Sequence, residues 1–221
     1  MTLPASRIRS LLEWRAALAV MCAFPAGAVA QSASISASVI DANHYLLSSR
    51  LAGAAARLSY PFHNGPVSIR IGAERLAANS HRIGAPCAGL VQPGTCQPEP
   101  VRDDAHFTAA IAGLGVRVLD SRRLAVNLTG DLSFVVLNVD SHGLTSGGSI
   151  SAGKGMWDTN VGVEGAWSPW GQLPLAIEAG IAAGHVVPAA TDLQLDGYTP
   201  FEQSFDIVRV RVGLSWQFPS R

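Results

Sequence analysis

An imidazole and a hydroxyl lie two positions apart in His106-Phe107-Thr108, and one residue, Ala105, separates them from the acidic pair Asp103-Asp104. A hydroxyl beside a histidine that a carboxylate orients is the arrangement of an activated nucleophile. No further residue completes such a group, so we expect His106 to be an ordinary polar residue at the end of a strand. The other histidines show no metal-ligand spacing, and we predict no catalytic residue, no metal site and no cofactor; they are His44, His63, His81, His142 and His185.

Charged residues at alternating positions are the most regular chemical feature of the chain. Each lies on the polar side of a segment in which polar and apolar residues alternate. Unpaired, a buried charge would cost several kcal/mol, so we predict a network of ion pairs among them. Lys154 is the only lysine, and arginine suits buried pairing because its guanidinium group binds carboxylates in a bidentate way. The predicted network comprises Arg57, Arg70, Glu74, Arg117, Asp131, Glu164, Glu178, Arg209 and Arg211.

Eight strand-like segments position these side chains, with short and long connections in alternation. Their apolar residues recur with period 2, as in strands that have one apolar and one polar face. No segment offers 18 consecutive apolar residues, the signature of a transmembrane helix. The segments are Ser32–Ile40, Leu47–Tyr60, Val67–Leu76, His106–Leu119, Leu124–Asn138, Met156–Trp167, Leu175–Val187 and Phe205–Phe218. Because the last two are neighbours, we predict that Glu178 is the partner of Arg209 and Arg211. Ile111 is an exception on the polar face.

The last segment has the clearest alternation. Val208, Val210 and Val212 continue into Leu214, Trp216 and Phe218 on one side, whereas Arg209 and Arg211 lie on the other. An unbroken apolar face opposite two arginines fits a wall between lipid and a polar interior. Short turns at one end and long loops at the other are typical of bacterial outer-membrane barrels. The sequence therefore predicts an all-β fold, an eight-stranded antiparallel transmembrane up-and-down β-barrel.

The N-terminal segment resembles a secretory signal peptide. Arg7, Arg9 and Arg15 are basic, Ala16–Phe24 is a short apolar core, and Ala28-Val29-Ala30 is a cleavage site. We therefore predict that residues 1–30 are a signal peptide and that residues 31–221 form one barrel domain. Its net charge of about −2 gives no basic excess for nucleic-acid binding. Cys87 and Cys96 remain after cleavage, and in an oxidising compartment we expect them to form a disulfide within a loop.

Arg211-Val-Gly213-Leu-Ser-Trp216-Gln-Phe218 resembles the C-terminal signal by which outer-membrane barrels are recognised for insertion. The chain thus resembles the small eight-stranded barrels of the OmpA, OmpX, Ail and opacity-protein group. This resemblance implies a monomer in the outer membrane that interacts with its lipid, with lipopolysaccharide and with the barrel assembly machinery. An even strand count places both termini in the periplasm. Pro219, Ser220 and Arg221 follow the aromatic residue that usually ends the signal.

Three functions are left open by these observations. The first, which we favour, is a structural or surface-interaction role without catalysis, in which the long loops contact an external ligand. The second is a lipid A-modifying enzyme that uses His106 and Thr108, since lipid A deacylases of the outer membrane carry a His-x-Ser arrangement. The third is a narrow ion-conducting channel. Loop acids that could meet divalent cations are expected to be solvated; they are Asp140, Asp158, Asp192, Asp196 and Glu202.

Overall fold

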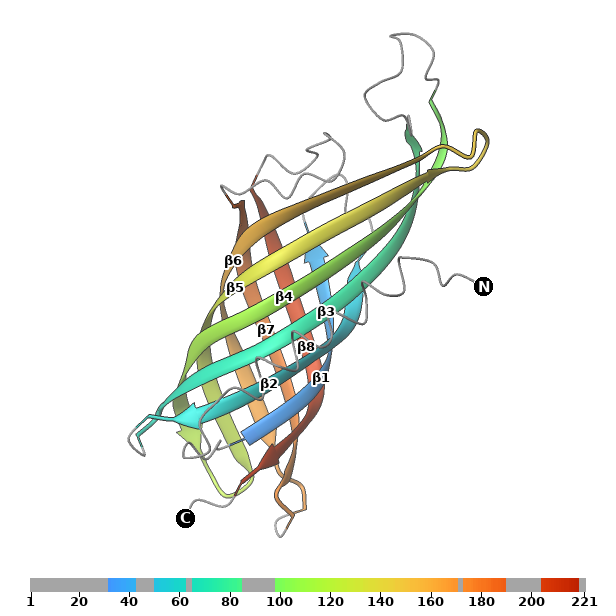
Figure 1. Ribbon diagram of the computed structural model, residues 1–221. Helices are drawn as coiled ribbons and strands as arrows, with labels where there is room; N and C mark the ends of the chain where they lie inside the picture. Colours follow the sequence, from blue (N-terminus) through green and yellow to red (C-terminus); the bar gives the residue numbers. More distant parts are fainter. Residues whose placement is uncertain are drawn as a thin grey trace, which may run out of the picture.

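The computed structural model describes residues 32–42, 50–62, 65–84, 98–170, 173–189 and 204–218. Within these ranges the chain forms eight antiparallel strands, each paired with the next, and β1 closes the barrel against β8. Figure 1 shows the strands inclined around one barrel. The predicted fold class is therefore confirmed. The strands are β1 (Ser32–Ala42), β2 (Leu51–Pro61), β3 (Val67–Gly84), β4 (Glu99–Asp120), β5 (Leu124–Gly143), β6 (Ser149–Trp167), β7 (Leu175–Pro188) and β8 (Phe205–Gln217).

Tight turns join the strands at one end of the barrel, which we call the turn end. The Phe62 amide donates to the Val67 carbonyl and the Ser121 amide to the Leu124 carbonyl, at 2.8 and 2.9 Å. Ser32 pairs with Gln217 at the same end. The opposite end, which we call the loop end, contains the other four connections, of which the one between β5 and β6 has only the residues 144–148 and is shorter than predicted. Within the described ranges, no helix is long and apolar enough to cross a membrane.

The strands β3 to β6 are longer than the sequence predicted. The loops expected before His106 and after Asn138 are partly strand, because β4 begins at Glu99 and β5 continues to Gly143. The pairing of β3 with β4 continues to Gly84, whereas β2 pairs with β3 only as far as Ala77. These four strands therefore form a wall that extends beyond the rest of the barrel at the loop end, as Figure 1 shows. We call this part the tall wall.

The side chains alternate between the interior and the outer surface, as expected for paired strands. On β8 the buried residues are Phe205, Ile207, Arg209, Arg211 and Ser215, and the residues between them are exposed or half-buried. On the outer surface, Val161 and Ile35 are 70% and 71% exposed. The barrel thus has an apolar outside, and its interior contains both charged and apolar layers.

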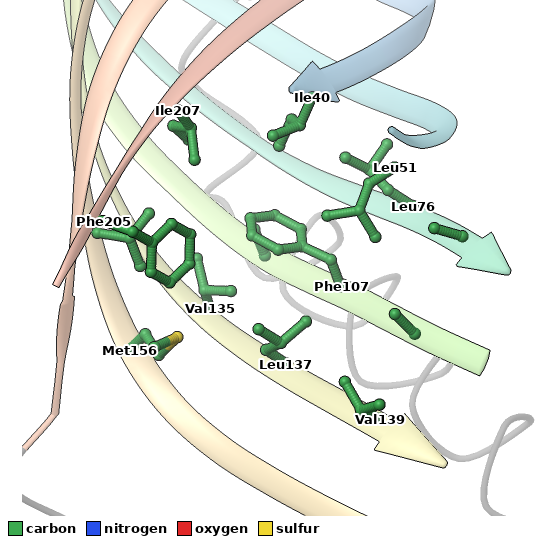
Figure 2. Close-up of a cluster of buried hydrophobic side chains, with 14 of the residues drawn as sticks. Ile40, Leu51, Leu76, Phe107, Val135, Leu137, Val139, Met156, Phe205 and Ile207 are labelled. Atoms are coloured by element: carbon green, nitrogen blue, oxygen red, sulfur yellow. The ribbon is translucent and has the colours of Figure 1, made fainter. Parts of the chain in front are cut away.

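The interior near the loop end is apolar, whereas the alternating pattern predicts a lumen filled by charged residues. Phe107, Met156 and Phe205 meet there, and Figure 2 shows these side chains pointing toward one another from different strands. Ile111, the apolar exception on the predicted polar face, belongs to this cluster. We call it the apolar plug; its main residues are Ile40, Leu51, Leu76, Phe107, Ile111, Val135, Leu137, Val139, Met156, Val186, Phe205 and Ile207.

Candidate functional site

Arg209 lies at the centre of the interior, below the apolar plug. It is 1% exposed, and its Nε and Nη2 atoms lie 3.1 Å from Glu74 Oε2 and 2.8 Å from Asp158 Oδ2. Arg211 Nε lies 3.6 Å from Glu74 Oε1, the oxygen to which the Ser38 hydroxyl also donates. Two arginines and two carboxylates therefore balance each other in a layer that excludes solvent. We call these four charged residues the central layer.

A second layer of charges lies nearer the turn end. Arg57 Nη1 lies 3.3 Å from Glu164 Oε2, and Arg57 Nη2 lies 3.8 Å from Asp131 Oδ2. Arg70 contacts the same carboxylates, with Nη1 at 3.7 Å from Asp131 Oδ1 and Nη2 bonded to Glu164 Oε2. Each arginine therefore reaches across the interior to both β5 and β6, Arg57 from β2 and Arg70 from β3. We call these four residues the lower layer.

The predicted pairing of Glu178 with Arg209 and Arg211 is wrong. In register, Glu178 faces Gly213, and Arg211 faces Gly180. The two arginines instead extend across the interior to carboxylates on β3 and β6, which do not neighbour β8. Glu178 lies instead on β7, next to the strand that carries Glu164, and among the described residues no ion pair joins it to Arg209 or Arg211.

Asp158 and Arg117 also differ from their predicted environments. Asp158 was expected to be a solvated acid at the end of a loop, yet it is fully buried and binds Arg209. The sequence does indicate that Asp158 faces inward, because Asp158 lies on the same alternating face as Asn160 and Glu164. Arg117 lies near the turn end, where its Nη1 contacts Asp120 Oδ2 at 3.0 Å and joins neither layer.

A cavity of about 660 Å³ occupies the interior between the lower layer and the turn end. Its deep wall includes Arg57, Arg70 and Glu164, and its mouth is formed by the turns that contain Arg122 and Ser168. Serine side chains cover much of the remaining wall: Ser32, Ser34, Ser59, Ser68 and Ser215. The cavity is therefore open at the turn end and ends at the lower layer. We call it the vestibule.

The residues of the catalytic alternative lie on the outer surface. His106 pairs with Ala77 and Asn138 in register, and Thr108 with Arg75 and Val136, so no carboxylate faces either residue directly. The preceding outward acid, Asp104, is bound to Arg102 at 3.1 Å. Asp103 points inward and binds Arg82 and Ser141.

A second outward row contains a histidine that a carboxylate does orient. His185 Nδ1 lies 2.7 Å from Asp206 Oδ1, and Thr159 faces His185 on β6. The Thr159 hydroxyl, however, donates to the His185 backbone carbonyl at 3.4 Å. Its proton is thus directed at the backbone, and the row does not form the hydrogen-bonded chain of an activated nucleophile. Among the described residues, no group of three His, Cys, Asp or Glu side chains could hold a metal ion.

The residues of the predicted insertion signal lie in and just after β8. Arg211 and Gly213 face the interior and Trp216 faces outward, where it is 49% exposed. A Cβ atom at Gly213 would lie 2.2 Å from the Ile35 carbonyl oxygen, so the signal glycine also allows close pairing with β1. Outside the described residues lie the segment predicted to be a signal peptide, the predicted disulfide residues Cys87 and Cys96, and three of the loop acids, Asp192, Asp196 and Glu202.

The comparisons with known proteins agree with this architecture. No protein-family model matches the chain, and no curated protein sequence matches it. Among solved structures, it is similar to Ail of Yersinia pestis, in complex with the heparin analogue sucrose octasulfate, with a TM-score of 0.50 and 15% identity over 86% of this chain and 100% of that chain. For a major outer membrane protein from Thermus thermophilus, the TM-score is 0.48 and the identity 12%, over 84% of this chain and 99% of that chain. For Neisserial surface protein A, the TM-score is 0.45 and the identity 12%, over 85% of this chain and 96% of that chain. The chain thus has the fold of the small eight-stranded barrels of bacterial outer membranes.

Proposed function

We propose that the protein is a monomeric outer-membrane barrel with a closed interior, which supports the envelope and contacts molecules at the cell surface without catalysis. The observation that carries this proposal is the continuous apolar belt on the outside. On β8 the belt includes every outward side chain from Val208 to Trp216, a stretch of about the 9–11 residues that a tilted strand needs to cross a bilayer. In water, such a belt would greatly exceed the apolar patches of soluble proteins.

The limits of the belt support the same location. Toward the loop end, each strand or its flank presents a polar side chain as the first residue beyond the belt: Asp41, Arg50, Arg75, Thr108, Asn138, Thr159, His185 and Asp206. Toward the turn end, aromatic side chains mark the other limit, among them Tyr60, Trp167 and Trp216. Amphipathic aromatic rings favour the depth of lipid headgroups. By analogy with bacterial barrels, whose short turns are periplasmic, we place the turn end and both termini in the periplasm.

The filled interior favours a closed barrel over a channel. Between the vestibule and the loop end, a solute would have to cross the central layer and then the apolar plug. Breaking a buried ion pair costs about 3–5 kcal/mol, and an apolar constriction of packed side chains excludes water. The protein therefore maintains no steady aqueous path.

The tall wall is the surface that we propose for external contacts. His81, Arg102 and His142 lie side by side in register across β3, β4 and β5, facing outward at the loop end. Arg102 pairs with Asp104 at 3.1 Å but stays 47% exposed, and a guanidinium group between two imidazoles suits an anionic partner such as the phosphate groups of lipopolysaccharide. The similar barrel of Ail was solved with a heparin analogue, itself an anionic ligand. The barrel would thus present its binding residues on rigid strands as well as on loops.

Three measurements on the same protein test this function. Folded barrel should migrate differently before and after heating on gels, and Trp216→Ala with Phe218→Ala should abolish this difference because the insertion signal is lost. In planar bilayers, the wild type should show no large steady conductance. In a lipid A mass-spectrometry assay, it should remove no acyl chain. Stable conductance, or acyl loss that His106→Ala abolishes, would favour the channel or the enzyme instead.

A further inference from the structure

The vestibule combines an excess of positive charge with buried donors. Five arginines and three acidic residues line it, and a fourth acid, Asp131, lies behind Arg57 and Arg70. The wall is therefore positive by one charge even when every carboxyl group is ionised; the arginines are Arg57, Arg70, Arg117, Arg122 and Arg123, and the lining acids are Asp120, Glu164 and Glu178. A concave site of one charge sign with low-dielectric walls concentrates ions of the opposite sign. The vestibule therefore attracts anions.

The deep arginines retain donor capacity. Arg57 and Arg70 are both 4% exposed, and within the described residues three of their nitrogen atoms have no hydrogen-bond partner. These are Arg57 Nε, and Arg57 Nη2 and Arg70 Nη1, which face Asp131 at 3.8 and 3.7 Å, too far for a hydrogen bond. Buried donors of this kind are normally satisfied, by water where the protein provides no acceptor. An anion with several oxygen atoms can accept from such guanidinium groups in a bidentate way.

The mouth provides a second pair of arginines. Arg122 and Arg123 occupy the turn between β4 and β5 at the opening. Among the described residues, neither of them has an ion-pair partner, in contrast to Arg117, which binds Asp120. The mouth is therefore cationic, and an anion meets first these two arginines and then the deep pair.

The rest of the wall carries hydroxyl and amide groups. Serines 32, 34, 59, 68 and 215 line it together with Asn127 and Gln217. Its volume of about 660 Å³ is within the range of small-molecule sites, roughly 300–1,000 Å³. We propose that the vestibule binds a phosphate dianion from the turn-end side of the barrel, either free or carried by a small polyhydroxylated molecule such as a sugar phosphate. A phosphate group presents three acceptor oxygens to the arginines, and the serines match the hydroxyl groups of a saccharide.

Isothermal titration of the folded barrel in a non-ionic detergent near neutral pH tests this site. The probes are inorganic phosphate, glucose 6-phosphate and, as a neutral control, glucose. Phosphate and glucose 6-phosphate should bind saturably and glucose should not. If the dissociation constant is lower for glucose 6-phosphate than for inorganic phosphate, the ligand is a phosphate group attached to a small molecule. If the two dissociation constants are equal, the ligand is free phosphate. The proposal is overturned if neither anion saturates the barrel at about 10 mM. That concentration corresponds to a binding free energy weaker than about −3 kcal/mol.

Two variants of equal charge locate the site. Arg122→Gln with Arg123→Gln removes both arginines at the mouth and should weaken phosphate binding at least about tenfold. Arg50→Gln with Arg75→Gln removes the same charge from the outer surface and should leave the dissociation constant unchanged. Heat-modifiable migration on gels confirms that both variants are folded. Equal weakening in the two variants would mean that only net charge matters, and no vestibule site would exist.

Discussion

Replacing Arg209 by leucine is the most direct test of the charged interior. Arg209 is the only residue that the structure shows bound to Asp158 by an ion pair within the described ranges, at 2.8 Å, and it also contacts Glu74 at 3.1 Å. After Arg209→Leu, Glu74 still accepts from Ser38 and lies near Arg211. Asp158 is fully buried, and the hydrogen bond that it keeps among the described residues is the one from the Asn160 amide, at 3.4 Å.

The expected cost follows from this difference between the two carboxylates. Removing one partner of a buried ion pair typically costs 3–5 kcal/mol, because the other charge stays buried without compensation. We therefore expect Arg209→Leu to lower the free energy of unfolding by about 4 kcal/mol. Adding Asp158→Asn removes the stranded charge, so the double variant should recover about 1–3 kcal/mol of this loss.

The measurement is urea unfolding of the barrel in lipid vesicles, followed by tryptophan fluorescence. Arg50→Leu is the matched control, because the Arg50–Asp41 pair has a similar N–O distance of 3.2 Å but side chains that are 76% and 63% exposed. Its loss should cost less than about 1 kcal/mol. The reasoning fails if Arg209→Leu costs no more than Arg50→Leu. It also fails if Asp158→Asn adds its own full cost to that of Arg209→Leu.

Three further changes test other parts of the structure. Val210→Arg places a charge in the middle of the outer belt. In the same urea assay it should destabilise the barrel in lipid by about 2–4 kcal/mol. An unchanged free energy of unfolding would mean that the belt does not face lipid. Gly213→Ala should lower the free energy of unfolding by about 1–3 kcal/mol, because the added Cβ would lie 2.2 Å from a backbone oxygen. Gly130→Ala should be tolerated, because nothing lies within 4 Å of its Cβ position. Equal effects of the two changes would contradict the close packing at Gly213. Cys87 and Cys96 should be bridged in protein isolated from the envelope, and replacing both by serine should leave the barrel folded; mass spectrometry that finds two free thiols would refute the bridge.

The fold could be predicted because barrel strands carry their orientation in the sequence. Alternation with period 2 in segments such as Phe205–Gln217 predicts which side chains face inward, and short turns between such segments predict antiparallel neighbours. Strand ends were harder to predict at the tall wall. In β4, Arg102, Asp103 and Asp104 are consecutive charged residues, so polarity no longer distinguishes the two faces. The structure resolves them, with Asp103 buried and Arg102 exposed.

The sequence predicts which charged residues face the interior, but it does not predict which of them form ion pairs. Alternation identified Arg209 and Arg211 as inward-facing residues, yet an arginine side chain is long enough to cross an eight-stranded interior. Adjacent strands are therefore poor guides to the partner, and Arg209 binds Glu74 and Asp158 instead of Glu178. Partners across a lumen depend on the depth of each side chain along the barrel axis, and this depth follows from strand register and tilt, which the sequence does not give.

The order of the interior layers has a consequence for both the central charges and the vestibule. The apolar plug lies between the central layer and the loop end, so water cannot reach Arg209 from that side. Low local dielectric strengthens an ion pair whose partners are already in contact, and it makes an unpaired charge more costly. The lower layer lies against the open vestibule, where Glu164 stays 14% exposed and where solvent or an anion can reach the arginines. Substitutions that open the plug, such as Phe107→Ala, should therefore weaken the central layer by admitting water, while the vestibule keeps its charge and remains closed at its deep end by Arg57 and Arg70.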